Sequence, residues 1–406
     1  MEWGRVTCWA LYDFANSPYS TIMTTLGFPL FFLAVVVPGR TGPLMWGLLY
    51  GVSEVVAAAL SPGLGAWSDQ WKRRKPFLIS FSLMAIGGTA LCSLLGEGDW
   101  LSAWIFFGLA NVGFACANVF YNALLVDVAP PGRTETVSGI GWGTGYLGGL
   151  LGMILAIPLY KAGVGADNIH NVHLSFLLVA GVFLLFSIPI FLLKERAPAA
   201  TPASGGLIAA YKRVWETLKA IHRFRNLFWF LLANFFFNDG LNTVILFAGA
   251  YGKEILHLAT TQIFLLFVYL QIVAAAGAYL VGWVADWLGS RRTLLVLVGS
   301  WVLLTVGLAS VQSYLQFVVV ACLAGFLLGP TQSVARGFLA RLAPRDMEGE
   351  FYGFFGMAGK VAALIGPVLF GGVTSFTGSM RLGALSMIPM FGLGWFFLWR
   401  VKEDRA

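Results

Sequence analysis

Residues 65–74 read GAWSDQWKRR, and residues 282–292 read GWVADWLGSRR. In each stretch an apolar segment ends at a glycine, an aspartate follows four positions later, and a basic loop comes next. Because the two copies lie in matching parts of a very apolar chain, they predict a duplicated membrane bundle. Parallel repeats with a binding site between them are a common way to build a transporter.

Two further motif pairs occur in the same order. DFANS at residues 13–17 is matched by DGLNT at 239–243, and the Ala-Pro…Gly pattern at 129–139 is matched at 343–353. The three pairs are separated by 226, 217 and 214 residues. An offset that drifts this slowly is what small loop deletions after a duplication would leave.

Composition places the chain in a membrane. It has 406 residues, of which 58% are hydrophobic and 11% are charged, whereas soluble domains have about 25% charged residues. Apolar stretches of about 20 residues can cross a bilayer as helices. We therefore predict an all-α polytopic fold with twelve spans, near residues 6–34, 44–67, 76–95, 101–127, 138–160, 173–193, 226–250, 262–285, 293–311, 314–340, 351–375 and 382–400.

Basic residues predict the sidedness. An even number of spans puts both termini on one side, and the first span is interpreted as a retained helix rather than a cleaved signal peptide. The short loops on the side of the termini contain Lys72, Arg73, Arg74, Lys75, Arg133, Arg291, Arg292 and Arg345, and the opposite loops contain Arg40, Lys161, Lys253 and Arg381. Positive-inside bias then places both termini in the cytoplasm. It also accounts for the net charge of +7 without a nucleic-acid partner.

The predicted organisation is an N-terminal six-helix bundle at 1–193, a linker at 194–225 and a C-terminal six-helix bundle at 226–406. Within the linker, apolar residues recur at helical spacing from Leu207 to Phe224, with basic residues mostly on other faces. This pattern predicts an amphipathic helix at the membrane surface. Such a helix is either a strap that couples the bundles or a simple tether with basic anchors.

Two polar stripes inside the spans are the main candidate substrate or ion site. On a helix, positions i, i+3 and i+4 share a face. Residues Asp13, Asn16 and Ser17 therefore form one stripe, and Asp239, Asn242 and Thr243 form the other. Pro18 and Gly240 weaken the neighbouring helix and free backbone carbonyls for a ligand. The alternative is a hydrogen-bonded structural contact between the bundles.

Three further charges lie at bilayer depth, where an ionisable group costs at least about 2.5–3.5 kcal/mol. Glu54 is either a proton carrier, since burial favours the protonated form of a carboxyl group, or a partner for a buried cation. Arg336 and Lys360 either neutralise Asp239 or Glu54 or bind a substrate carboxylate. Polar and aromatic residues that supply further candidate edges of a cavity include Tyr121, Asn122, Trp142 and Gln332.

Other features predict no cofactor and no catalytic site. The four cysteines form no C-x-x-C pair and are expected to pack as small core residues. His170 and His173 share a predicted exterior loop with Asp167, which makes a metal site there only a minor alternative. The glycine-rich pattern at 143–148 lies inside a span and indicates close helix packing. No Walker phosphate-binding loop occurs, so ATP is not the direct energy source.

The whole chain resembles the major facilitator superfamily. The segment from Gly65 to Arg74 is similar to that family's loop between helices two and three, and the copy from Gly282 is similar to its echo between helices eight and nine. Two departures are Lys72, where glycine is usual, and Ser290, where a basic residue is usual. The resemblance implies that Asp69 faces the start of the eleventh span and that Arg73 pairs with Asp127. Together with Gly65, Gly282, Asp286 and Arg341, these groups would then form gating contacts that close the cytoplasmic side in the outward-open state.

The two acidic motifs suggest a narrower resemblance. Residues 9–17 (WALYDFANS) and 238–243 (NDGLNT) are similar to the vacuole-effluxer branch, which includes autophagy-related amino-acid exporters. This resemblance implies export of amino acids or similar small zwitterions, with coupling to protons.

The sequence therefore predicts a monomeric secondary transporter in a bacterial inner membrane that works by alternating access on a small-molecule substrate. Its partners would be the substrate, a coupling ion, expected to be the proton, and the lipid bilayer. One rival is an exporter of amphipathic drugs or lipids, which an aromatic content of 15% permits. Rivals of another class are a transporter-like sensor and a membrane enzyme, although no nucleophile or metal constellation supports an enzyme.

Overall fold

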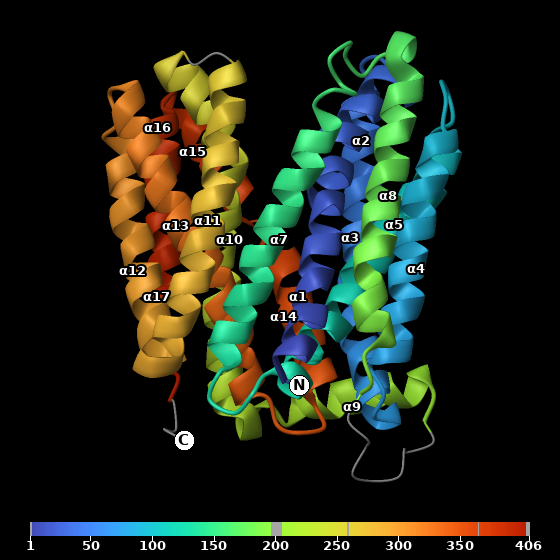
Figure 1. The fold of residues 1–406 in the computed structure, drawn as a ribbon. Coiled ribbons are helices and arrows are strands. Elements are labelled where there is room, and N and C mark those ends of the chain that lie inside the picture. The colour runs from blue at the N-terminus through green and yellow to red at the C-terminus, as the bar shows by residue number, and fades with distance from the viewer. Residues whose placement is uncertain (1, 196–204, 258–259, 364, 403–406) are drawn as a thin grey trace. The chain divides into compact units, whose positions relative to one another are not determined.

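The computed structural model describes residues 2–195, 205–257, 260–363 and 365–402. These residues are helical or in connecting turns, and they include twelve helical stretches that are long and apolar enough to cross a membrane. The predicted all-α class and the twelve spans are thus confirmed. Within each unit, Figure 1 shows the long helices running roughly side by side.

The described chain divides into two compact units. Unit 1 comprises residues 1–129, 144–211 and 346–353. Its long helices pack in the pairs α4–α5, α3–α5 and α1–α8. The elements that lie wholly in this unit are α1 (Glu2–Tyr19), η1 (Ser20–Leu26), α2 (Gly27–Phe31), η2 (Phe32–Val36), α3 (Gly42–Trp71), α4 (Lys75–Leu91), η3 (Cys92–Leu94), α5 (Trp100–Ala123), α6 (Leu125–Val128), η4 (Ala166–Asn168) and α8 (Ile169–Leu192).

Unit 2 comprises residues 130–143, 212–345 and 354–406. Its main helix pairs are α11–α13, α10–α17 and α12–α13. The elements that lie wholly in this unit are η5 (Ile221–Phe224), α10 (Arg225–Leu256), α11 (Thr260–Leu288), α12 (Ser290–Ala309), α13 (Tyr314–Leu342), α15 (Ile365–Thr377), α16 (Met380–Leu385) and α17 (Ile388–Arg400).

Three helices run from one unit into the other. The first part of α7 (Thr134–Ala156) belongs to unit 2 and its remainder to unit 1. The first part of α14 (Glu348–Ala362) belongs to unit 1 and its remainder to unit 2. In the linker, α9 (Leu207–Lys219) changes unit after Tyr211. The predicted division into 1–193, 194–225 and 226–406 stays a prediction, because the compact units follow packing rather than chain order.

Small residues allow helices to approach closely within each unit. A Cβ atom added at Gly88 of α4 would lie 2.6 Å from the backbone nitrogen of Ala110, and one at Gly113 of α5 would lie 2.7 Å from that of Ala85. Both positions are therefore restricted to glycine by a neighbouring backbone. Such close packing is how helices associate where the solvent is lipid and offers little hydrophobic driving force.

Several spans are irregular, and two of them lie at the acidic stripes. The first span contains two π-helical segments, η1 and η2, which follow Pro18 in the acidic motif. The eleventh span is divided into α14 and α15, which end and begin at Ala362 and Ile365. Short π segments and interruptions in membrane helices are frequent at functional positions. The first span carries one acidic stripe, and the eleventh span faces the other stripe, which lies on the uninterrupted helix α10.

Two local predictions need correction. His170 and His173 do not lie in an exterior loop, because both belong to α8, where Nε2 of His173 lies 2.8 Å from the carbonyl oxygen of Leu95. The linker helix predicted from Leu207 to Phe224 ends at Lys219, and the turn Ile221–Phe224 is a 3-10 helix. Residues 196–204 of the linker lie outside the described residues.

Candidate functional site

In unit 1, the first basic loop forms an ionic network. The Asp69 carboxylate, near the end of α3, accepts hydrogen bonds from the backbone nitrogens of Gly349 (3.0 Å) and Glu350 (2.8 Å) at the start of α14. A carboxylate at a helix N-terminus satisfies N–H groups that have no partner within the helix. The predicted contact between Asp69 and the start of the eleventh span is therefore present.

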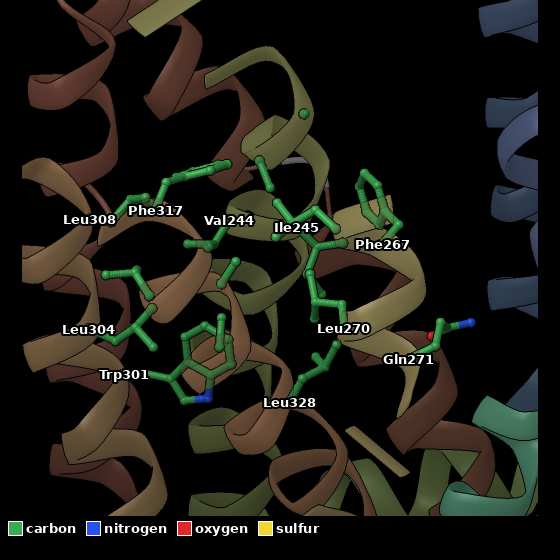
Figure 2. A pocket seen from close by; sticks show the side chains of 16 residues that line it. Val244, Ile245, Phe267, Leu270, Gln271, Trp301, Leu304, Leu308, Phe317 and Leu328 are labelled. Atoms are coloured by element: carbon green, nitrogen blue, oxygen red, sulfur yellow. The ribbon is translucent and has the colours of Figure 1, made fainter. Parts of the chain in front are cut away.

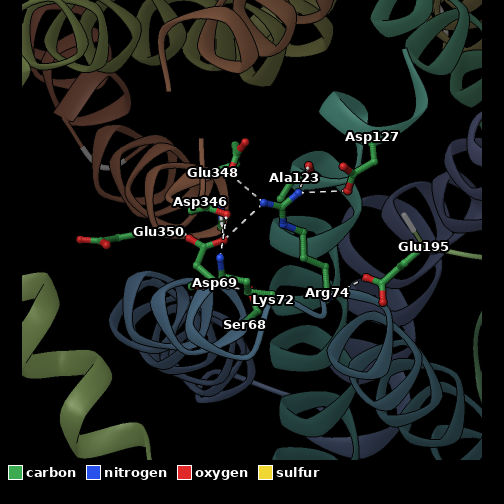
Figure 3. A network of polar contacts seen from close by, with 12 residues as sticks. Ser68, Asp69, Lys72, Arg74, Ala123, Asp127, Glu195, Asp346, Glu348 and Glu350 are labelled. Atoms are coloured by element: carbon green, nitrogen blue, oxygen red, sulfur yellow. Dashed lines mark hydrogen bonds and ion pairs between the residues drawn. The ribbon is translucent and has the colours of Figure 1, made fainter. Parts of the chain in front are cut away.

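Arg74 is the cation of this network (Figure 3). Its guanidinium lies 2.8 Å from Glu348, 3.2 Å from Asp127 and 3.4 Å from Asp69. Burial opposes the charge of Arg74, but these three carboxylates outweigh burial and raise its pKa above the usual value. Glu195 completes the surroundings by accepting from the backbone nitrogens of Arg74 and Lys75.

The prediction that Arg73 pairs with Asp127 is wrong. The partner is Arg74, whose side chain is 13% exposed, whereas Arg73 is exposed. The physical reason is the end of α3 at Trp71. Lys72 adopts a left-handed conformation with φ 52°, and this turn fixes which of the two consecutive arginines faces the α5–α6 side. A run of basic residues in the sequence does not show where that turn falls.

Unit 2 contains a matching network around the second loop. The Asp286 carboxylate, near the end of α11, accepts from the backbone nitrogens of Glu135 (3.1 Å) and Thr136 (2.8 Å) at the start of α7. The side chain of Glu135 is fully buried, accepts from the Ser290 hydroxyl and lies 3.1 Å from Nε of Arg341. Arg341 also lies 3.5 Å from Asp286. The three predicted gating residues Gly282, Asp286 and Arg341 therefore lie in one contact region.

The motif glycines are required by these contacts. A Cβ at Gly65 would collide with the carbonyl oxygen of Gly349, and one at Gly282 would lie 2.7 Å from the carbonyl oxygen of Glu135. Since each neighbour is backbone and cannot rotate away, a larger residue would push α14 or α7 off its capping aspartate. The glycine and aspartate of each motif thus act together: one permits the approach, and the other caps the helix that approaches.

The first acidic stripe lies on α1 in unit 1. Asp13 is half-buried, Asn16 is 5% exposed, and the Ser17 hydroxyl donates to the backbone carbonyl of Asp13 at 2.7 Å. The later part of α7 lies against this face, because a Cβ at Gly145 would be 3.0 Å from Oγ of Ser17 and 3.4 Å from Cβ of Asp13. The amide nitrogen of Asn16 is buried and has no hydrogen-bond partner among the described residues.

The second acidic stripe lies on α10 in unit 2, next to the interruption of the eleventh span. Asp239 and Thr243 are 0% exposed, and Asn242 is partly exposed. Oδ1 of Asp239 accepts from the backbone nitrogen of Gly366 at 2.9 Å, which caps the start of α15. Within the described residues, Oδ2 of Asp239 and the Thr243 hydroxyl have no hydrogen-bond partner. A buried carboxylate oxygen and a buried hydroxyl, one helical turn apart, are therefore available to a proton or a small ligand.

Arg336 lies in the contact between α13 and the start of α7. Its Nε donates to the Ser138 hydroxyl at 2.9 Å, and Nη2 donates to the Ser138 carbonyl at 2.7 Å. Its guanidinium carbon also lies 5.5 Å from the centroid of the Trp142 ring, within the range of a cation–π interaction. With 3% of its surface exposed, Arg336 stabilises this helix contact.

Glu54 on α3 pairs with a neutral side chain in unit 1. Asn111 of α5 is 1% exposed and donates from its amide to Glu54 at 2.7 Å and to Ser53 at 2.9 Å. The Tyr19 hydroxyl, at the junction of α1 and η1, is buried without a hydrogen-bond partner among the described residues. Glu54 is itself partly exposed, so its carboxylate combines a fixed hydrogen bond with access from outside the protein.

The remaining predicted positions are dispersed. Tyr121 is fully buried and stacks on Trp9 with a centroid distance of 4.6 Å and an interplanar angle of 16°, so its ring contributes to packing within unit 1. Asn122, Gln332 and Lys360 are each partly exposed, on α5, α13 and α14 respectively. Lys360 is therefore more accessible than Arg336.

Sequence reasoning missed several members of these networks: Arg74, Asn111, Glu135, Ser138, Glu195, Glu348 and Gly366. One signal for Glu135 and Glu348 was present, because acidic residues are favoured in the first turn of a helix. Apart from Arg74, which also contacts nearby Asp69, the others have no such local signal, since their partners lie far away in the chain.

Solved structures that align with this chain include transporters. FucP, a Major Facilitator Superfamily transporter in the outward conformation, aligns with a TM-score of 0.78 over 99% of both chains at 14% identity. The human organic anion transporter MFSD10 aligns with a TM-score of 0.79 over 98% of this chain and 99% of its own, at 16% identity. Identities this low establish the fold alone. The twelve spans and the paired loop motifs therefore have the fold of the major facilitator superfamily.

Sequence comparison defines the branch. The MFS-type transporter YxiO of Bacillus subtilis is 31% identical over 98% of this chain and 95% of its own length. Autophagy-related protein 22 of Eremothecium gossypii is 24% identical over 78% of this chain and 70% of its own length. Residues 45–406 match the family described as "Vacuole effluxer Atg22 like", and the chain belongs to this family. It is thus a multi-pass integral protein of the lipid bilayer, and as a transporter it has a small-molecule substrate.

Proposed function

We propose that this transporter exports an amino acid or a similar small zwitterion by alternating access, with protons as the coupling ion. The observation that carries the coupling is Asp239, a buried carboxyl group in a membrane span with one oxygen on the capped start of α15 and the other without a partner among the described residues. A carboxyl group in such surroundings is suited to take up and release a proton.

The cargo assignment rests on charges of both signs within the spans. Asp13 of α1 and Glu54 of α3 are partly exposed carboxylates, and Lys360 of α14 is a partly exposed ammonium. A zwitterion needs one group of each sign. Because Arg336 is 3% exposed and Lys360 is partly exposed, Lys360 is the more accessible candidate for the substrate carboxylate. Asn16, Asn242 and Gln332 would supply neutral hydrogen bonds.

The two capped helix starts would serve as the gate. In this proposal Asp69 holds α14 and Asp286 holds α7 on the cytoplasmic side, and both contacts break when that side opens. Positive-inside bias supports cytoplasmic termini. The relatives in bacteria support a bacterial inner membrane, and we expect a monomer.

The experiment uses purified protein in liposomes with an imposed pH gradient and a panel of labelled amino acids, peptides, sugars and dyes. Asp239→Asn should lower proton-driven flux by about 5- to 150-fold, which corresponds to a typical coupling free energy of about 1–3 kcal/mol. Substrate exchange in the absence of a gradient should continue. Asp167→Asn is the matched control, because Asp167 is exposed outside the stripes. If Asp13→Asn and Asp239→Asn both leave gradient-driven flux intact, the assignment is wrong.

An exporter of amphipathic drugs or lipids is the alternative within transport. The same panel distinguishes the two, because gradient-driven flux of dyes but not of amino acids would favour the alternative.

A further inference from the structure

A second feature of unit 2 is an apolar cavity of about 110 Å³ between four helices (Figure 2). Val244 and Ile245 of α10 lie on one wall, Leu270 of α11 on another, and Leu304 of α12 and Leu328 of α13 on the others. Trp301 and Phe317 add aromatic surface. The cavity is thus built from side chains that favour a hydrocarbon guest.

The polar atoms near the cavity are few. The Trp301 indole nitrogen already donates to the Thr331 hydroxyl at 3.1 Å. Gln271 of α11 is the one polar side chain among the lining residues, and Figure 2 shows its amide pointing away from the apolar group. An ordered water needs two to four polar partners. This cavity offers too few partners to hold water well.

The dimensions set the size of the guest. An apolar cavity of about 150 Å³ in a protein core stays dry and binds benzene or xenon. At about 110 Å³, this cavity is slightly smaller, so it suits a branched aliphatic group or a single aromatic ring after a small side-chain adjustment. A charged guest is excluded, because an unpaired charge among apolar side chains is costly.

We propose that this cavity is a binding site for a small neutral molecule made of one aromatic ring or one branched aliphatic group. Rotation of the Gln271 side chain from the orientation in Figure 2 would bring its amide to a neutral polar substituent of the guest, since an amide both donates and accepts hydrogen bonds. The site uses none of Asp13, Glu54 and Asp239, so it stands whether or not the protein is a proton-coupled exporter of zwitterions.

Binding is tested with the full-length protein in lipid nanodiscs, with fluorobenzene as the probe and ¹⁹F NMR as the readout. Empty nanodiscs give the signal that arises from partitioning into lipid. The expected result is a bound signal that saturates at one site per protein and is displaced by toluene. If the folded protein gives only the signal of empty nanodiscs, the proposal is overturned, including the case in which lipid acyl chains already fill the cavity.

Two substitutions localise the site. Ala321→Leu, in the cavity wall on α13, should fill the space and weaken fluorobenzene binding by about tenfold or more, which corresponds to about 1.4 kcal/mol. Leu304→Ala should enlarge the space and allow a bulkier probe, tert-butylbenzene, to bind. The matched control is Leu303→Ala, because Leu303 directly precedes Leu304 on α12 but is 75% exposed. Unchanged binding in Ala321→Leu, or equal effects of the Leu303 and Leu304 variants, would refute the location.

Gln271→Leu tests the contact with the polar substituent. It should weaken binding of p-cresol by roughly tenfold, because one hydrogen bond to the guest is lost. Binding of toluene, which has no hydroxyl group, should stay unchanged. Equal weakening for both probes would show that the amide does not recognise the guest.

Discussion

The two loop networks differ in the source of their cation. In unit 1 the cation is Arg74, in the loop after α3, and it meets Asp127 near the end of the fourth span. In unit 2 the cation is Arg341, which stands two residues before Ala343-Pro344, as Asp127 stands two residues before Ala129-Pro130. The sign of the charge at this position is therefore reversed between the repeats.

Both networks keep the same backbone contact. Asp69 accepts from two nitrogens at the start of α14, and Asp286 accepts from two nitrogens at the start of α7. This difference teaches that the fold requires a carboxylate that caps the neighbouring helix and a glycine where the two helices come close. The cation that neutralises the carboxylate can come from any element that reaches it. Side-chain charges have changed around an unchanged backbone arrangement.

The largest expected effect comes from Arg74→Ala. Its loss leaves Asp69, Asp127 and Glu348 without their shared cation, and removing one partner of a buried ion pair costs about 3–5 kcal/mol. The free energy of unfolding should fall by that amount, measured by steric trapping in bicelles. Arg73→Ala, at the exposed neighbouring position, should change it by no more than about 0.5 kcal/mol. Equal losses for the two variants would contradict the assignment of Arg74.

Arg341→Ala should have a smaller effect, because its side chain is 32% exposed and water replaces part of the lost interaction. We expect a loss of about 1–3 kcal/mol, mainly from the buried Glu135 carboxylate. The control is Arg345→Ala, which removes an exposed arginine from the adjacent loop. A loss for Arg341→Ala as large as that for Arg74→Ala would show that the two networks are equivalent after all.

The smallest effect tests whether the cation can move between elements. The double variant Arg74→Ser with Asp127→Arg moves the cation of unit 1 from the loop to the position that corresponds to Arg341 in unit 2. It should be more stable than Arg74→Ser alone by about 1 kcal/mol, the scale of a partly exposed charged hydrogen bond. Stability below that of Arg74→Ser would show that the unit 1 network needs its cation in the loop.

Some of the candidate site could be predicted from the sequence because its signals are local. Asp239 and Thr243 share a helix face by spacing alone, and their burial within a span was expected from the surrounding apolar residues. The interruption after Ala362 and the bond from Gly366 to Asp239 were not predictable, since residues 239 and 366 are far apart in the chain.

Arg336 has contacts that the sequence did not show. A cation deep in a span suggests a ligand contact or a neutralising partner for Asp239 or Glu54, and this stays a prediction. The structure adds contacts with Ser138 and Trp142, because the first part of α7 belongs to the same compact unit as α13. Span order along the chain does not reveal that α7 and α14 each belong partly to both units.

The sequence by itself determined the membrane environment, the twelve spans, the duplication and the superfamily. These depend on hydropathy and on motifs within about ten residues, which local chemistry fixes before any tertiary contact forms. Tertiary structure alone decided that Arg74 rather than Arg73 joins the network, that Asp239 caps α15, and that an apolar cavity lies beside Trp301. Each of these depends on how helices rotate and approach one another, and that is set by the packing of residues distant in the chain.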